Sequence, residues 1–127
     1  MTQGTGYLFI LMTAFFTVAG QLIIKWRIDS IKFSLNGTSI DKVQSIILLL
    51  LDKYIMLGLF FALFAALFWM AALSKFNLSH AYPMILALLT LLSVVTAVVF
   101  LGESLSYIKM IGVSIIFFGL IILWLGG

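Results

Sequence analysis

Polar side chains recur at every fourth position of the first apolar segment, at Thr13, Thr17, Gln21 and Lys25. Side chains four residues apart lie on the same face of a helix. An amide group in hydrocarbon needs a hydrogen-bonding partner, so we expect Gln21 to face the protein interior or a wet cavity. For Thr13 and Thr17, ordinary hydrogen bonds to neighbouring helices explain a polar residue equally well.

Charged side chains form a second group of candidates. Lys25 ends the first apolar segment beside Arg27, and Glu103 and Lys109 flank the last connection. Glu103 can pair with Lys25 or Lys109, or it can accept hydrogen bonds from hydroxyl groups. The alternatives are a lysine that extends to the lipid headgroups and an interfacial ion pair that contributes little energy.

Aromatic residues are the third group. Tyr82 and His80 begin the third apolar segment, where rings with polar tips are favoured at a membrane interface in any case. We expect Pro83 in the first turn of that helix, where proline costs no hydrogen bond. Trp69 lies inside the second apolar segment, where it can wall a cavity or pack against lipid or core.

The segments that carry these residues are predicted to cross a membrane. Of the 127 residues, 65% are hydrophobic and 9% are charged, which leaves too little polar surface for a soluble globular domain. About 20 apolar residues span the hydrocarbon core, and backbone groups there must be hydrogen-bonded within their own segment. We therefore expect an all-α membrane protein, a single domain 1–127 with helices at 6–26, 54–74, 80–101 and 107–125.

The connection between the first two spans is long, and its residues 40–51 are predicted to form a short helix on the membrane surface. Ser39 is the expected N-cap. At about 1.5 Å per residue, this helix is too short to cross the bilayer. Its apolar residues share one face, which is typical of an interfacial amphipathic helix. The alternative, an extension of the second span, is weakened by Asp52 and Lys53 at the junction.

Composition also excludes several kinds of site. The chain has no cysteine, so disulfides, thiol catalysis and cysteine-ligated metals are ruled out. Nothing in the sequence indicates a catalytic site, a metal or a cofactor. The net charge of +3 comes from residues that flank the apolar spans, which favours membrane lipids over nucleic acid as partners.

Several short motifs resemble those of one superfamily of membrane transporters. Residues 18–25, V-A-G-Q-L-I-I-K, resemble the V-A-G-Q-L-x-x-K signature of the aminoarabinose-phosphoundecaprenol flippase subunits. The A-Y-P of residues 81–83 and the L-G-E of residues 101–103 resemble landmarks of the same subunits and of EamA-type transporters. Their order in a four-span chain resembles the drug/metabolite transporter superfamily, which includes the small multidrug resistance proteins. The resemblance covers all but the long first connection.

This resemblance implies a transporter, and most closely a flippase that moves a polyprenyl-phosphate-linked sugar across the bacterial inner membrane. The polar stripe would then carry the sugar headgroup and Lys25 would contact its phosphate. Trp69, Tyr82 and Glu103 are the further substrate-binding candidates. The chain would make no covalent change to the substrate, so it would not be an enzyme.

Two other functions stay open. Small multidrug exporters bind protons and cations at a glutamate in their first helix, but alignment on Lys25 places Thr17 at that position. Because no span has a carboxylate at its centre, an exporter of small cations or metabolites is the weaker transport hypothesis. A membrane subunit that scaffolds a glycosyltransferase is the alternative outside transport, and it should tolerate apolar residues along the stripe.

The fourth span carries a predicted dimer interface. Gly112, Ile116 and Gly119 lie on one helix face, and glycines there permit close approach of another helix. The pattern resembles the dimerisation helix of small multidrug exporters, although glycine is common in membrane helices. A four-helix unit is small for a translocation path, so we expect a homodimer, or a heterodimer with a related four-helix subunit.

Basic residues predict the orientation. One lysine, Lys75, flanks the second connection, whereas the first and third connections carry Lys25, Arg27, Lys32, Lys42, Lys53 and Lys109. Since basic loops stay in the cytoplasm, the first and third connections should be cytoplasmic and both termini outside. The same bias argues against insertion of one chain in both orientations.

Single-cysteine labelling tests this orientation on a chain that has no native cysteine. A membrane-impermeant maleimide should label Ser34→Cys only after spheroplasts are permeabilised, because the first connection should face the cytoplasm. Rapid labelling of this variant in intact spheroplasts would overturn the orientation.

Overall fold

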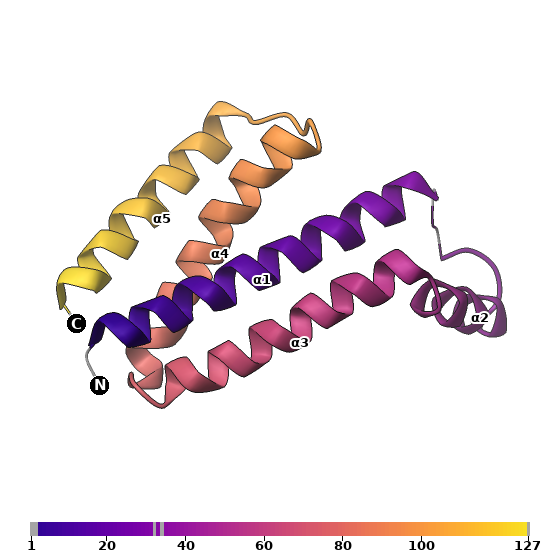
Figure 1. Ribbon diagram of the computed structural model, residues 1–127. Coiled ribbons are helices and arrows are strands. Elements are labelled where there is room, and N and C mark those ends of the chain that lie inside the picture. Colours follow the sequence, from indigo (N-terminus) through magenta and orange to yellow (C-terminus); the bar gives the residue numbers. More distant parts are fainter. Residues whose placement is uncertain (1–2, 32, 34, 127) are drawn as a thin grey trace.

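The computed structural model describes residues 3–31, 33 and 35–126, and in that part of the chain every regular element is a helix (Figure 1). Lys32 and Ser34, which enter the predicted orientation and its test, lie outside these ranges. The helices are α1 (Gln3–Ser30), α2 (Ser39–Leu50), α3 (Lys53–Leu73), α4 (Leu78–Phe100) and α5 (Tyr107–Gly126). All except α2 are long and apolar enough to cross a membrane. The predicted all-α membrane fold, with a short helix between the first two spans, is confirmed.

Helix α1 lies at the centre of the bundle. It packs along α3 on one side and against α4 on the other, whereas α5 packs on α4. Figure 1 shows the start of α1 and the end of α5 at one end of the bundle, and α2 at the other end. We call these the terminal end and the α2 end. The helix with the predicted polar stripe therefore lies between the two neighbours that could complete a site.

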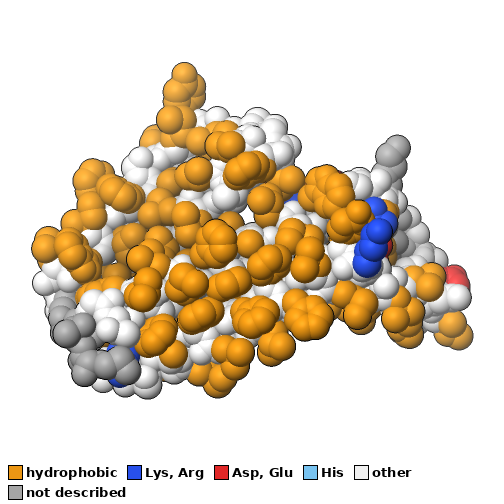
Figure 2. All heavy atoms as spheres, in the orientation of Figure 1, with side chains coloured by type: hydrophobic (Ala, Val, Ile, Leu, Met, Phe, Trp, Pro, Cys, Tyr) orange, Lys and Arg blue, Asp and Glu red, His pale blue; other side chains and the backbone are white. Residues whose placement is uncertain are grey.

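Hydrophobic side chains cover the outside of the bundle. Figure 2 shows them along the length of the visible face, whereas basic and acidic side chains are visible near the α2 end and further basic atoms at the terminal end. Ile10, Ala14, Ala72 and Ile85 form a small buried cluster between α1, α3 and α4. Because lipid tails are as apolar as these side chains, close packing rather than the hydrophobic effect must hold the helices together.

The packing of α1 against α3 includes a close contact that depends on two glycines. A Cβ atom on Gly20 of α1 would lie 2.8 Å from the carbonyl oxygen of Gly58 in α3. A Cβ on Gly58 would lie 2.6 Å from Cγ1 of Ile24. Glycine alone allows this separation. By contrast, a Cβ on Gly112 or Gly119 would meet nothing within 4 Å, so these residues face open space in the single chain.

Helix α2 begins one residue earlier than the sequence suggested, because Thr38 rather than Ser39 is its N-cap. The backbone N–H of Asp41 donates to Thr38 Oγ1 at 3.3 Å, and the backbone N–H of Thr38 donates to Asp41 Oδ2 at 3.2 Å. This reciprocal pair is a capping box. None of the residues of α2 is buried, and Ile40 and Val43 on its apolar face are exposed. The helix is therefore free to lie in the membrane interface.

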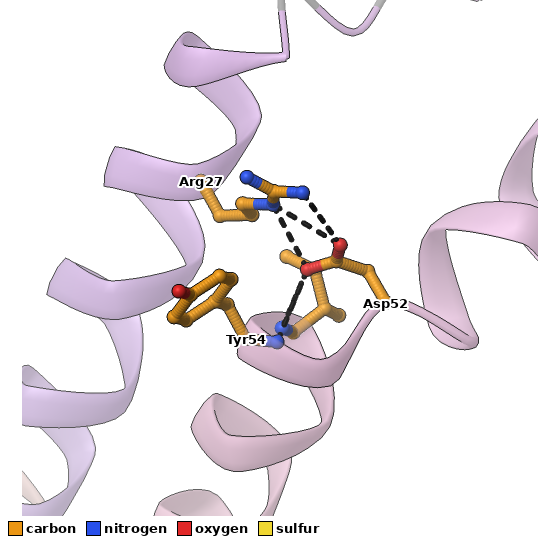
Figure 3. Close-up of polar contacts among 4 residues, drawn as sticks. Arg27, Asp52 and Tyr54 are labelled. Atoms are coloured by element: carbon orange, nitrogen blue, oxygen red, sulfur yellow. Dashed lines mark hydrogen bonds and ion pairs between the residues drawn. The ribbon is translucent and has the colours of Figure 1, made fainter.

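An ion pair separates α2 from α3 and ties α3 to α1 (Figure 3). Asp52 is the N-cap of α3, and its carboxylate accepts hydrogen bonds from the backbone N–H groups of Tyr54 and Ile55. The guanidinium of Arg27 binds the same carboxylate, with Nε 3.0 Å from Oδ2 and Nη2 2.9 Å from Oδ1. It also lies 5.0 Å from the centre of the Tyr54 ring. In the sequence, Asp52 indicated only a break between two helices, and its pairing with Arg27 was not predicted.

Helix α4 also begins earlier than expected. It starts at Leu78, so Pro83 lies in its second turn, and the expectation of a first-turn proline is wrong. Proline has no N–H, so the carbonyl of Ser79 loses the donor that a helix normally supplies four residues on. Because this loss falls next to the helix N-terminus, α4 continues past it to Phe100.

The Arg27–Asp52 pair predicts a pH-dependent stability. The hydrogen bond from Arg27 holds the pKa of Asp52 below its ordinary value of 3.8. A lowered pKa in the folded state stabilises the protein above the ordinary pKa, and this contribution is lost as the pH falls through the lowered value. Asp52→Asn should lower the melting temperature in detergent by a few degrees at neutral pH. The difference from the parent should shrink below about pH 4.

Asp29→Asn is the matched control. Asp29 pairs with Lys25 on the exposed surface of α1, and exposed pairs contribute little to stability. Its melting temperature should stay close to that of the parent. Equal loss in the two variants, or a loss for Asp52→Asn that does not change with acidification, would contradict the role given to the Arg27 pair.

Candidate functional site

A groove between α1 and α4 brings three of the predicted site residues together. It has a volume of about 220 Å³, lies towards the α2 end, and includes Gln21, Lys25 and Glu103 in its lining. Its remaining lining residues come from α1, α4 and the residue after α4: Val18, Leu22, Ser93, Thr96, Ala97 and Leu101. Both sides of the groove therefore offer polar groups (amide, hydroxyl and charged) next to apolar side chains.

Gln21 reaches across the groove to α4. Its Oε1 accepts a long hydrogen bond of 3.4 Å from Ser93 Oγ. Thr96 lies one turn further along α4, and its hydroxyl donates to the carbonyl of Leu92 at 2.8 Å. Gln21 is exposed in the single chain, so its amide can also meet a ligand in the groove. The expectation that its amide finds a polar partner is thus met by Ser93.

Lys25 stands at the open end of the groove, and it pairs with Asp29 rather than with Glu103. Its Nζ lies 3.1 Å from Asp29 Oδ1, and about half of each side chain is exposed (51% and 55%). In the part of the chain that the structure describes, Glu103 forms no ion pair. Lys25 pairs with Asp29 because Asp29 lies one turn further along the same helix. Such an exposed pair is weak, so an anionic ligand can displace Asp29 from Lys25.

The L-G-E turn after α4 places Glu103 at the edge of the groove. Gly102 has a φ of 68°, which favours glycine, and the Glu103 N–H donates to the carbonyl of Ala97 at 3.2 Å. Beyond Glu103 lies a second cavity of about 280 Å³, which shares Ser93 and Ala97 with the groove. Lys109 lines this second cavity. Glu103 therefore stands between two cavities that each contain one lysine.

The other residues of the polar stripe do not line the groove. Thr13 is buried (5% exposed), and its hydroxyl donates to the carbonyl of Phe9 at 2.8 Å. Thr17 is half-buried outside the lining. The reason is helix geometry, since each step of four residues turns about 40° around the axis. Thr13 lies three such steps before Lys25, so its side chain is rotated by about 120° around the helix axis relative to that of Lys25. It therefore packs inside the bundle.

Two aromatic candidates lie away from the groove as well. Trp69 packs against the buried cluster of Ile10, Ala14, Ala72 and Ile85. Its ring centre lies 6.4 Å from that of Tyr82. Both rings are towards the terminal end of the bundle. The structure therefore brings Trp69 and Tyr82 together with each other, but not with Gln21, Lys25 or Glu103.

Sequence reasoning missed the contribution of α4 to the groove. Ser93 and Thr96 lie, with Thr90, in the mostly apolar second half of α4, and their spacing of three residues places them on one face. That spacing is a signal comparable to the one that singled out Gln21. The arrangement can hold a ligand with hydroxyl groups and a negative charge at the polar lining residues, while an apolar part of the ligand stays against Val18 and Leu22 or in lipid.

Comparison with known proteins supports the motif resemblance. No family model matches the chain, and no solved structure matches it. It is 31% identical over 123 residues, 94% of each chain, to a protein of Enterobacter sp. (strain 638) named "Probable 4-amino-4-deoxy-L-arabinose-phosphoundecaprenol flippase subunit ArnF". With its four spanning helices, the protein is a multi-pass membrane transporter rather than an enzyme. The chain belongs to the family of the 4-amino-4-deoxy-L-arabinose-phosphoundecaprenol flippase subunits.

Proposed function

We propose that this protein is one subunit of a flippase that moves a polyprenyl-phosphate-linked sugar across the bacterial inner membrane. The observation that carries the proposal is the groove, whose lining combines Gln21, Lys25 and Glu103 with apolar residues of α1 and α4. Lys25 would bind the phosphate, and Gln21 and Glu103 would bind hydroxyl groups of the sugar. The prenyl chain would remain in the surrounding lipid.

The groove offers what a polar headgroup lacks in a bilayer. Moving a charged or hydroxyl-rich group into hydrocarbon is costly unless its hydrogen bonds are replaced. The amide of Gln21 and the hydroxyl of Ser93 lie deeper in the bundle than Lys25, which stands at the α2 end. The weak Lys25–Asp29 pair keeps the lysine at the entrance until a phosphate replaces the carboxylate.

We propose that the α2 end faces the cytoplasm. Six of the seven Lys and Arg residues flank the connections at this end, and Lys75 flanks the one at the terminal end. Basic connections are retained in the cytoplasm. The sugar-lipid would then enter the groove from the cytoplasmic leaflet, and both ends of the described chain would lie outside.

A second subunit is needed to complete the path. The groove occupies the α2 end, and towards the terminal end the polar stripe of α1 turns into the packed interior at Thr13. Helix α5 contributes no buried residue, and Gly112 and Gly119 face open space on it. Ile116, on the same helix face, would join them in the contact. We propose that this face of α5 binds a second copy or a related four-helix subunit.

Leucine substitutions in the groove test the transport function. Lys25→Leu should reduce surface appearance of the modified glycolipid by about tenfold or more, since a hydrogen bond to a charged group contributes about 1.5–3 kcal/mol. Gln21→Leu should reduce it less, because a hydrogen bond between neutral groups contributes about 0.5–1.5 kcal/mol. Lys25→Arg should keep much of the activity because arginine also binds phosphate. The measurement uses cells that lack the native protein.

Two control variants separate the groove from general damage. Thr13→Val keeps the shape of a packed side chain outside the groove, and Lys53→Leu removes an equal charge at the same end without changing the lining. Both should transport normally. Full activity in both Gln21→Leu and Lys25→Leu would contradict the transport role of the groove and favour the scaffold hypothesis.

Glycine substitutions test the subunit contact. Gly112→Leu and Gly119→Leu should lower crosslinking between subunits and leave the melting temperature of the single chain unchanged, because their side chains would enter open space. Gly58→Leu should do the opposite and destabilise the chain itself, because it would collide with α1. Unchanged crosslinking yields in both α5 variants would remove this face from the interface.

A further inference from the structure

A polar cleft lies at the terminal end of the bundle, opposite the groove. It has a volume of about 670 Å³ and is formed by the α3–α4 connection, the start of α4 and the end of α5. Its polar lining residues are Lys75, Asn77, Ser79 and His80. None of these residues lines the groove that contains Gln21 and Lys25.

Close packing holds the walls of this cleft in place. A Cβ on Gly6 of α1 would lie 2.6 Å from Cε2 of Phe76 and 3.0 Å from Cβ of Lys75, so glycine lets the α3–α4 connection press against α1. The ring of Phe76 lies 4.8 Å from that of Tyr7. The Tyr7 hydroxyl is 3.2 Å from Nε2 of His80. Tyr7, Phe76 and His80 therefore fix the position of the cleft relative to α1.

The charge of the cleft favours an anion. Lys75 forms no ion pair within the described part of the chain. The aspartates and the glutamate of the sequence all lie in α1, α2, the α4–α5 connection or the start of α3, close to the α2 end. Asn77 makes no capping hydrogen bond to α4, so its amide can reach a ligand. A phosphate here would meet an ammonium, an amide and an imidazole.

An apolar cavity of about 290 Å³ lies one turn further along α4, since His80 lines the cleft and Met84 lines this cavity. It lies between α1, α4 and α5 where α1 and α5 do not pack together, and its lining residues are Tyr7, Ile10, Leu11, Met84, Leu88, Leu120, Ile121 and Trp124. Tyr7 lines this cavity while its hydroxyl contacts His80 of the cleft. The contact between Tyr7 and His80 thus links the wall of the apolar cavity to the wall of the polar cleft.

We propose that the two cavities form one binding site for a phosphate-bearing lipid at the terminal end of the bundle. The phosphate would lie at Lys75, Asn77 and His80, and the first part of the hydrocarbon chain would lie in the apolar cavity. The occupant is the polyprenyl-phosphate lipid after its headgroup has crossed, and this identity rests on the proposed function. Free phosphate would use the cleft and leave the apolar cavity empty.

The position of Trp124 provides a direct test. Trp26→Phe with Trp69→Phe leaves Trp124, in the wall of the apolar cavity, as the one tryptophan of the chain. Undecaprenyl phosphate added to this purified protein in detergent should give a saturable change in Trp124 emission. Lys75→Leu should weaken the apparent affinity for undecaprenyl phosphate by about tenfold or more, because the variant lacks the ammonium group of the charge-assisted contact. Undecaprenol, which lacks the phosphate, should bind the parent protein about as weakly as undecaprenyl phosphate binds the variant.

The other arms of the experiment separate sources and sites. Inorganic phosphate should neither change Trp124 emission nor displace undecaprenyl phosphate at equal concentration. Lys25→Leu and Lys53→Leu should leave the Trp124 signal unchanged, because neither residue lines these cavities. Parent-like affinity in Lys75→Leu, or equal binding of undecaprenol and its phosphate, would overturn the proposal. Lys75→Gln serves the same purpose if the leucine variant does not fold.

The second site and the transport function can fail separately. If Gln21→Leu and Lys25→Leu transported normally while Trp124 still reported binding, the transport role of the groove would be lost and the terminal site would stand as a lipid site. If those two variants lost transport and undecaprenyl phosphate left Trp124 emission unchanged, the groove would stand and the terminal site would be refuted.

Discussion

The contact of α1 with α3 at Gly20 and Gly58 determines how the rest of the bundle is arranged. In a bilayer no water is released when two apolar helices meet, so the gain comes from close fit. Here two backbones touch because neither residue has a side chain. With Gly20 held on α3, Gln21 points about 100° further around α1, towards α4. The same contact that secures the fold therefore turns the polar groups of α1 into the groove.

Charged residues complete this arrangement at the ends of the helices. Arg27 and Asp52 join the end of α1 to the start of α3, and Asp52 also stops α2 from merging with α3. The weaker Lys25–Asp29 pair lies one turn away on the exposed side. The chain thus contains a paired, partly buried arginine that serves the fold and an exposed lysine that remains exchangeable. This difference between neighbouring cations is what suits Lys25, rather than Arg27, to a ligand.

The sequence predicted the elements well because hydrocarbon restricts the choices so strongly. Length and apolarity identify the spans. The polar stripe and the motif resemblance singled out Gln21, Lys25 and Glu103, which line one groove. The sequence predicted less where the position of a side chain depends on rotation around its helix axis, or where its partner is distant in the sequence. Thr13 left the groove because a spacing of four drifts around the helix, and the Arg27–Asp52 pair joins residues 25 positions apart. Thr38 and Ser39 are both good N-caps, so only the position of Asp41 decided between them.

The pairing of helices also has a mechanical consequence. The α1–α3 and α4–α5 pairs meet chiefly where α1 packs on α4, and the cluster around Ala14 and Ile85 lies in that seam. The groove lies towards the α2 end from this cluster, and the apolar cavity, which Ile10 of the cluster also lines, lies towards the terminal end. A rigid rotation of one pair about the cluster, used as a pivot, would widen one cavity while it narrowed the other. Such a rotation would therefore couple two cavities that lie towards opposite ends of the membrane-spanning helices.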